Sequence, residues 1–247
     1  MVPFQIGWLL FLLTMALLTW IAHMALRRRT RKVQRTTLLL LAIVNICCST
    51  AFTFDYIRNP DVLFPFTQNL PFQFCTLATF LMVPAIWFNW RPLRLVVYFP
   101  GVLGGFLALV SPAEMYQGRQ FLSLSTLFFT VHALNVILPV LMGSLGIFRP
   151  TARDAAWALV WFVALAMTVL CMTLALRAWF DSGSNYFYFF DPEGAGILVA
   201  LWNLIHIPIV YEIPLLPFAL AAFFGQYGLY KLGSAIARRV RPAPQLA

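Results

Sequence analysis

Residues 5–35 read QIGWLLFLLTMALLTWIAHMALRRRTRKVQR, an apolar run over 5–26 followed at once by a basic cluster. About 20 consecutive apolar residues let an α-helix cross the hydrocarbon core of a bilayer, so residues 5–26 are predicted to span a membrane. Lysine and arginine beside a span are retained on the cytoplasmic side, which places the N-terminus outside. The basic cluster follows the apolar run, the reverse of the order in a cleavable signal peptide. This stretch predicts a helical membrane protein.

The composition of the whole chain agrees with that class. Of the 247 residues 62% are hydrophobic and 10% are charged, with a mean hydropathy of +0.83, whereas about a quarter of the residues in a soluble domain are charged. The net charge of +9 would suggest a nucleic-acid partner in a soluble protein, but the basic residues stand at the ends of apolar runs. We therefore expect no nucleic-acid partner. The four cysteines lie inside apolar runs, and we expect no disulfide framework.

Further apolar runs predict an all-α, polytopic transmembrane bundle of about seven spanning helices. After residues 5–26 the predicted spans are 36–54, 66–88, 93–110, 120–148, 152–180 and a last one that ends near residue 232. The run over 196–232 is too long for one upright helix. We therefore expect a short interfacial or re-entrant helix up to about residue 210, with the last span beginning at the breaks of Pro208, Pro214 and Pro217. Residues 1–237 are predicted to form one transmembrane domain, and residues 238–247 a short basic, proline-containing cytoplasmic tail.

The distribution of charge supports this topology. Only Arg58, Arg119 and Arg177 fall on the predicted outer side, and the other basic residues collect at the predicted inner ends of the spans. The C-terminus is then cytoplasmic. The expected location is the cell membrane, in a bacterium the inner membrane.

Two side chains within the apolar runs, Cys75 and His132, are the candidate chemical groups. A polar or nucleophilic group at membrane depth is costly and calls for an explanation. Measured from the predicted inner ends of their helices, Cys75 lies about 21 Å and His132 about 24 Å deep, at the 1.5 Å rise per residue of an α-helix. They can therefore share one level in the outer half of the bilayer, where a histidine could act as the base for a thiol nucleophile.

Other polar residues fall near the same level. Ser125, His132 and Asn135 lie on one stripe of their predicted helix, and Thr79 lies one turn from Cys75. The alternative is structural: Cys75 packs, and His132 bonds a neighbouring helix. Asn45 is expected to serve helix packing through interhelical hydrogen bonds.

The short helix after residue 196 offers a second, weaker set. Asn203 and His206 are spaced i, i+3 and could line the same pocket, or they could be interfacial side chains with polar tips. The three histidines are too widely separated to form a metal-binding pair, so no metal and no cofactor are expected.

Three short motifs carry a resemblance to a known family. They are Leu-Pro-x-x-x-Cys at 70–75, Thr-Val-His-Ala-Leu at 130–134, and Asn-Tyr-Phe-Tyr-Phe-Phe-Asp-Pro at 185–192. In order and spacing, over about residues 65–232, they resemble the bacterial YwaF-like integral membrane proteins, which are similar to the eukaryotic transmembrane protein 164 group. The chain departs from the pattern at Gln73, where many bacterial members have histidine, and at Asp191-Pro192-Glu193, where the loop is usually basic.

The resemblance implies an intramembrane acyltransferase. In such an enzyme a cysteine takes an acyl chain from a phospholipid as a thioester and passes it to a lysolipid, with a histidine as general base. Carried over, Cys75 would be the nucleophile and His132 the base. Asn135 or Asn185 would orient the base or stabilise the oxyanion, and Gln73 and Tyr186 would support the pocket.

The leading hypothesis is thus a lipid acyltransferase or lipase-like enzyme whose partners are membrane lipids, with a phospholipid or lysophospholipid as substrate. A second hypothesis is a non-enzymatic transporter or binding component for a small apolar or lipid-like ligand, which would form no thioester on Cys75. A third is a structural subunit, in which the polar groups of the helices pair with one another and leave no cavity.

Overall fold

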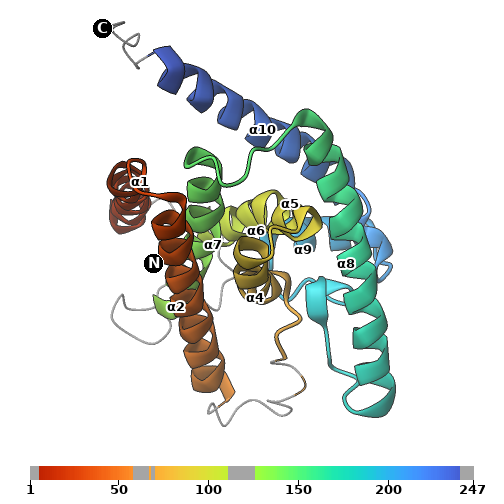
Figure 1. Ribbon diagram of the computed structural model, residues 1–247. Helices are drawn as coiled ribbons and strands as arrows, with labels where there is room; N and C mark the ends of the chain where they lie inside the picture. The colour runs from red at the N-terminus through yellow and green to blue at the C-terminus, as the bar shows by residue number, and fades with distance from the viewer. Residues whose placement is uncertain (1–5, 58–66, 68–69, 111–125, 240–247) are drawn as a thin grey trace, which may run out of the picture.

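The computed structural model describes residues 6–57, 67, 70–110 and 126–239, and all regular structure in these ranges is helical (Figure 1). The elements are α1 (Ile6–Leu26), α2 (Arg31–Ile57), α4 (Phe74–Trp87), α5 (Arg91–Tyr98), α6 (Pro100–Val110), α7 (Thr126–Ser144), α8 (Ala152–Trp179), η2 (Tyr186–Tyr188), α9 (Gly196–Leu204), η3 (Val210–Glu212) and α10 (Leu215–Arg239). The all-α prediction is confirmed for the described part of the chain.

Six helical segments of the described chain are long and apolar enough to cross a membrane, which supports a multi-pass membrane protein. They cover residues 6–26, 31–54, 91–110, 127–144, 152–179 and 210–237. The predicted span 66–88 differs, because its helix α4 begins only at Phe74 and has 14 residues, about 21 Å at 1.5 Å per residue. Gln73 before it is extended, with φ −62° and ψ 137°. By length and composition the described chain therefore has six candidate spans and one shorter apolar helix.

The predicted span 93–110 is made of two helices. The helices α5 and α6 meet at Phe99 and Pro100, because proline has no N–H to donate into the preceding turn. Gln226 of α10 donates from Nε2 to the Phe99 carbonyl at the break, over 3.3 Å. Together the two helices still form one apolar segment of 20 residues.

The last part of the chain is divided as expected. The short helix α9 precedes an irregular stretch, and the long helix α10 begins directly after Pro214. The location of α9 relative to a membrane stays a prediction.

The bundle has a central group of helices with longer helices around it. In Figure 1, α4, α5, α6 and α7 occupy the centre, α2 packs against α4 and α7 on one side, and α8 packs against α5 and α10 on the other. The core includes the fully buried side chains of Met82, Ile86, Phe99, Leu138 and Leu141. Many large apolar side chains of α1, α8 and α10 are exposed, as expected where lipid replaces water.

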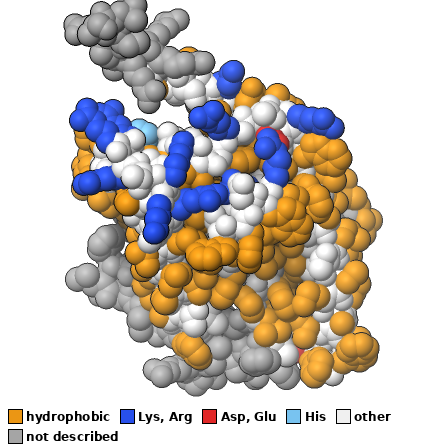
Figure 2. Space-filling view, viewed as in Figure 1, with side chains coloured by type: hydrophobic (Ala, Val, Ile, Leu, Met, Phe, Trp, Pro, Cys, Tyr) orange, Lys and Arg blue, Asp and Glu red, His pale blue; other side chains and the backbone are white. Residues whose placement is uncertain are grey.

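The basic turns lie together at one end of the bundle. Arg31 donates to the Leu145 carbonyl, Arg94 donates to the Ile147 carbonyl, and Arg91 binds Asp154. Figure 2 shows lysine and arginine side chains gathered at this end above an apolar surface. The shared location agrees with the topology inferred from the charges. Which side of a membrane this end faces stays a prediction.

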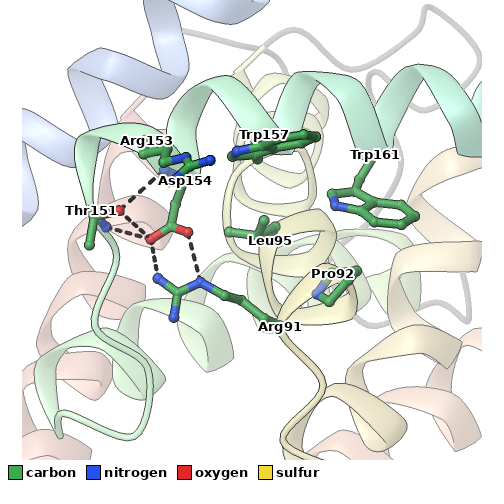
Figure 3. Close-up of a pocket in the computed structure, with 8 residues that line it drawn as sticks. All are labelled: Arg91, Pro92, Leu95, Thr151, Arg153, Asp154, Trp157 and Trp161. Carbon is green, nitrogen blue, oxygen red and sulfur yellow. Dashed lines mark hydrogen bonds and ion pairs between the residues drawn. The ribbon is translucent and has the colours of Figure 1, made fainter.

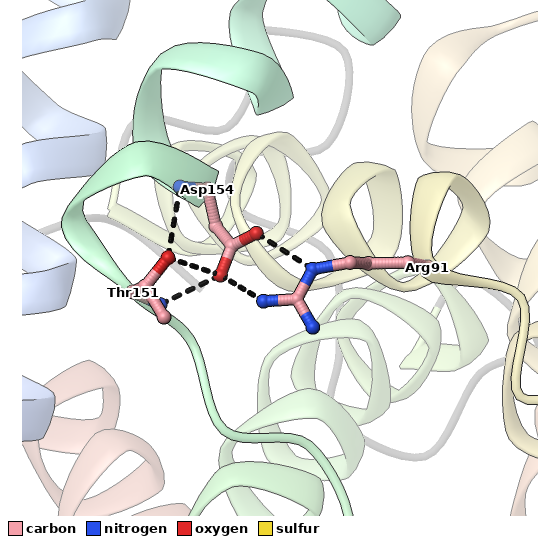
Figure 4. A network of polar contacts seen from close by, with 3 residues as sticks. All are labelled: Arg91, Thr151 and Asp154. Carbon is pink, nitrogen blue, oxygen red and sulfur yellow. Dashed lines mark hydrogen bonds and ion pairs between the residues drawn. The ribbon is translucent and has the colours of Figure 1, made fainter.

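A capping box and an ion pair fix the start of α8 at this end (Figure 4). The backbone N–H and the hydroxyl of Thr151 both donate to the Asp154 carboxylate, and the Asp154 N–H donates to the Thr151 hydroxyl. Arg91 donates to the same carboxylate from Nε and Nη2, over 2.8 and 2.5 Å. The carboxylate therefore links α5 to the first turn of α8.

Replacing Asp154 with alanine is expected to lower the free energy of unfolding by about 1–2 kcal/mol. The main loss is the cap, because the side chain of Arg91 is 55% exposed and an exposed ion pair contributes little. Thermal unfolding in detergent measures the effect. Arg153→Ala, at an exposed neighbouring position, is the control; equal shifts for both variants would contradict the prediction.

Candidate functional site

Gln73 joins the start of α4 to the loop that contains η2. Its Nε2 donates to the Asn185 carbonyl, and its Oε1 accepts from the Phe187 N–H, both over 3.1 Å. Both the NH2 donor and the oxygen acceptor of the side-chain amide are therefore hydrogen-bonded. Gln73 holds residues 185–187 against the turn that precedes Cys75.

Tyr186 adds a second link between these segments. Its side chain is 1% exposed, and its hydroxyl accepts from the Leu70 N–H over 3.0 Å and donates to the Thr67 carbonyl. Burial raises the pKa of Tyr186 well above its ordinary value, so the hydroxyl keeps the proton that it donates. Tyr186 thus fixes the backbone at the entry to α4.

Asn185 is committed to its own loop. Its Nδ2 lies 2.8 Å from both the Asp191 carbonyl and Glu193 Oε1, and its Oδ1 accepts from the Phe190 N–H. Burial raises the pKa of Glu193; the nearby Asp191 charge adds to this, and the bond from Asn185 opposes it. The structure thus gives Asn185 the role of organising the loop, and of the two candidate asparagines Asn135 is the one that binds next to the cysteine.

The same loop has an unusual backbone. Phe187 and Tyr188 both lie in the left-handed region, with φ of 58° and 64°, which costs non-glycine residues energy and is typical of functional sites. The Phe187 ring contacts the ring of Phe74, with centroids 5.5 Å apart. The strained segment therefore packs against the residue that precedes Cys75.

Asn135 is the centre of a buried polar cluster. It is fully buried, and its Nδ2 donates to the backbone carbonyl of Cys75 over 2.9 Å. Its Oδ1 accepts from Asn45 Nδ2 over 2.9 Å and from the Thr79 hydroxyl over 3.0 Å. The cluster joins α2, α4 and α7. Asn45 was expected to make an interhelical bond, but its connection to the cysteine turn could not be read from the sequence.

Two adjacent glycines bring the cysteine and histidine turns to one place on α6. A Cβ built on Gly104 would lie 3.0 Å from the Phe74 ring, with Cys75 Sγ in ordinary contact at 3.7 Å, and a Cβ built on Gly105 would lie 2.9 Å from the His132 carbonyl oxygen. Thus α6 contacts the first turn of α4 through one glycine and α7 through the next. These close approaches are the reason for glycine at both positions.

His132 is oriented by its own helix. Its side chain is 8% exposed, and Nδ1 donates to the Phe128 carbonyl over 2.7 Å. With Nδ1 protonated, Nε2 carries the lone pair and can accept a proton. Cys75 is partly exposed. Among the described residues, no hydrogen bond joins the Cys75 thiol to the His132 ring.

The remaining predicted site residues are Asn203, His206 and Ser125. Asn203 and His206 are exposed at the end of α9, where the His206 ring contacts Trp202, and within the described chain no hydrogen bond links them to the Asn135 cluster. Ser125 lies outside the described residues. In the parts of the chain that the structure covers, no group of three or more His, Cys, Asp or Glu residues could hold a metal ion.

Two surface hollows lie at the basic end of the bundle. One, of about 480 Å³, lies between α5 and α8, where Trp157 and Trp161 face Arg91 and Leu95 (Figure 3). The other, of about 280 Å³, is lined by Arg31, Arg35, Asn89, Gly146 and Ile147. Neither Cys75 nor His132 lines either hollow.

Replacing Gly105 with alanine is expected to destabilise the protein by about 1–3 kcal/mol, because the new Cβ would collide with a backbone oxygen of α7 and force the helices apart. Gly228→Ala in α10 is the matched control, since no atom of another described segment lies within 4 Å of its Cβ position. Alanine is the better helix former, so this control should gain up to about 1 kcal/mol. Thermal unfolding of both variants checks the opposite signs; changes of the same sign would refute the close contact.

Comparison with known proteins identifies the family. A search of curated proteins and of solved structures gave no match. The model of the TMEM164 family matches residues 2–224, nearly the whole chain, and its match spans both Cys75 and His132. This multi-pass membrane protein therefore belongs to the TMEM164 family.

Proposed function

We propose that this protein is an intramembrane lipid acyltransferase in which Cys75 is the nucleophile and His132 moves the proton. The observation that carries the proposal is the convergence at α6. Gly104 and Gly105 bring the cysteine turn and the histidine turn to adjacent points, and Asn135, one turn from His132, holds the Cys75 carbonyl.

In the first half-reaction Cys75 Sγ attacks the carbonyl carbon of a phospholipid acyl ester. The thiol proton passes to His132 Nε2, the nitrogen left free by the bond from Nδ1 to Phe128. A carbon–sulfur bond forms and the ester carbon–oxygen bond breaks. The departing alkoxide takes the proton from Nε2 and leaves as a lysolipid.

The second half-reaction runs in reverse with another acceptor. The hydroxyl of a lysolipid attacks the thioester carbonyl and gives its proton to His132. The carbon–sulfur bond breaks, and the thiolate recovers the proton. With water as acceptor the same steps amount to hydrolysis, the lipase-like variant. The thiol and imidazole need only close on each other when substrate is bound, as catalytic hydrogen bonds often do.

Asn135 acts as a positioning residue in this scheme. Its Nδ2 is used by the Cys75 carbonyl and its Oδ1 by Asn45 and Thr79. It therefore fixes the backbone of the nucleophile relative to α7.

The proposal is tested by the mass of the peptide that contains Cys75. The detergent-solubilised protein is incubated with a phospholipid of defined acyl chain and quenched in acid. The expected result is that the peptide gains the mass of the acyl group and loses it in neutral hydroxylamine, which cleaves thioesters. The peptide that contains Cys171, an exposed cysteine of α8, should stay unmodified. A protein that binds the lipid but never carries the added mass would instead be a binding or transport component.

A further inference from the structure

The smaller of the two hollows is built from three turns at the basic end. Arg31 and Arg35 come from the first two turns of α2, Asn89 from the turn between α4 and α5, and Gly146 and Ile147 from the turn after α7. Its volume of about 280 Å³ suits a head group but not a whole lipid.

The hollow is strongly cationic. Arg31 Nη2 lies 3.4 Å and Arg149 Nε 3.6 Å from the Cβ position of Gly146. Among the residues that the structure describes, no carboxylate lines the hollow. The nearby carboxylate of Asp154 is already bound by Arg91. Arg35 is partly buried and has no hydrogen bond or ion pair within the described chain.

Arg94 adds a buried positive charge beside the hollow. It is 5% exposed and donates from Nη1 to the carbonyl of Ile147, a residue that lines the hollow. Its Nη2 is buried and has no hydrogen-bond partner among the described residues. A buried guanidinium with an unpaired N–H therefore lies next to a hollow lined by Arg31 and Arg35.

Membrane topology alone does not explain this arrangement. A charge that only retains a loop on one side can remain in water, as the exposed Arg28 does. Burying a guanidinium with an unpaired N–H is costly unless an anion offsets its charge. The three turns therefore have the composition of an oxyanion site.

We propose that this hollow binds the phosphate group of an anionic phospholipid of the surrounding leaflet, with Arg31 and Arg35 as donors. The turn at Asn89 favours a lipid source, because its neighbours Trp87, Phe88 and Trp90 are 66%, 70% and 57% exposed. Exposed aromatic side chains of this kind sit at head-group level, where basic pockets between helices bind anionic lipids.

This lipid site is separate from the acyl-transfer site. Cys75 and the end of α4 at Trp87 are 12 residues apart, about 18 Å at the rise of an α-helix. The bound phosphate would tie the start of α2 to the other turns that line the hollow and offset the charges of Arg31 and Arg35. Its expected effect is on stability, whether or not Cys75 carries an acyl group.

The test is thermal unfolding of the full chain in detergent, titrated with phosphatidylglycerol, with zwitterionic phosphatidylcholine and with inorganic phosphate. Phosphatidylglycerol is expected to raise the unfolding temperature at far lower concentrations than the other two. Arg35→Gln should weaken this response about tenfold, the usual worth of one charge-assisted hydrogen bond. Because Arg35 makes no hydrogen bond of its own in the described chain, the variant should fold.

Arg28→Gln is the matched control, since it removes the same charge from the same basic segment outside the hollow. It should respond like the wild type, and Arg35→Lys should keep part of the response. Equal weakening in Arg28→Gln and Arg35→Gln, or no response of the wild-type protein, would overturn the site. Stabilisation by inorganic phosphate without any by phosphatidylglycerol would overturn the lipid as its source.

Discussion

Replacement of Cys75 by alanine is expected to abolish acyl transfer while leaving the fold intact. The thiol is the only atom group removed, and no hydrogen bond of the Cys75 side chain to another described residue is lost with it; the bonds from Asn135 and Thr79 go to its backbone carbonyl. Loss of a covalent nucleophile lowers the rate by at least about 10³-fold. The measurement is transfer of a labelled acyl chain between lipids by purified protein in vesicles.

Two further variants test whether the loss of transfer is specific to the Cys75 thiol and whether His132 is the base. Cys171→Ala removes an exposed thiol of α8 and should keep full activity. His132→Gln should slow transfer by about 10²–10⁴-fold, the usual contribution of a general base, while a trace of thioester still forms on Cys75. Full activity of Cys75→Ala would refute the nucleophile, and full activity of His132→Gln would refute the base.

Replacement of Asn135 by leucine is expected to cause the largest loss of stability in the bundle, about 2–5 kcal/mol. Three interhelical hydrogen bonds are lost, each worth about 0.6 kcal/mol in membrane bundles. The Asn45 amide is left as a buried donor without this acceptor, at roughly 1–3 kcal/mol. The Thr79 hydroxyl keeps its second acceptor, the Cys75 carbonyl. Acyl transfer should fall as well, since the Cys75 carbonyl is no longer held. Thermal unfolding in detergent and the vesicle assay measure the two effects.

Asn203→Leu is the control for this substitution, because Asn203 is exposed on α9; it should change the unfolding temperature little. The double variant Asn45→Leu, Asn135→Leu removes both partners of one bond and should recover part of the stability. If the double variant regains stability without regaining transfer, Asn135 positions the nucleophile. An Asn135→Leu variant as stable as the wild type would show that the cluster contributes nothing to the fold.

Gln73, the expected departure from the pattern of the bacterial relatives, has a structural role in this chain. Many bacterial members are expected to carry histidine where this chain has Gln73, and here the glutamine donates to the Asn185 carbonyl and accepts from the Phe187 N–H. A side-chain amide can donate and accept hydrogen bonds at any pH. Gln73 thus serves this chain as a clamp on the loop, and the proton transfer proposed here falls to His132.

The sequence by itself determined the class of protein and the bounds of α1 and α8, whereas α2 begins five residues earlier and α10 ends seven residues later than predicted. Apolar length and flanking charge are local properties, so α1, α2, α8 and the break before α10 could be predicted from short stretches. The sequence also singled out Cys75, His132 and Asn135, because few polar groups occur within the apolar runs. Only the tertiary structure decided which of them meet.

The physical reason is that lipid-facing and core-facing surfaces are both apolar, so the pattern of hydrophobic residues does not say which face of a helix packs on which neighbour. For this reason the link from Asn45 to Asn135 could not be predicted, nor the contact of Gly104 and Gly105 with two different helices. The pattern likewise does not say whether Asn203 and His206 face the same pocket as Cys75. Hydrophobic burial defined the helices, and their arrangement came from close backbone approach and a few buried hydrogen bonds.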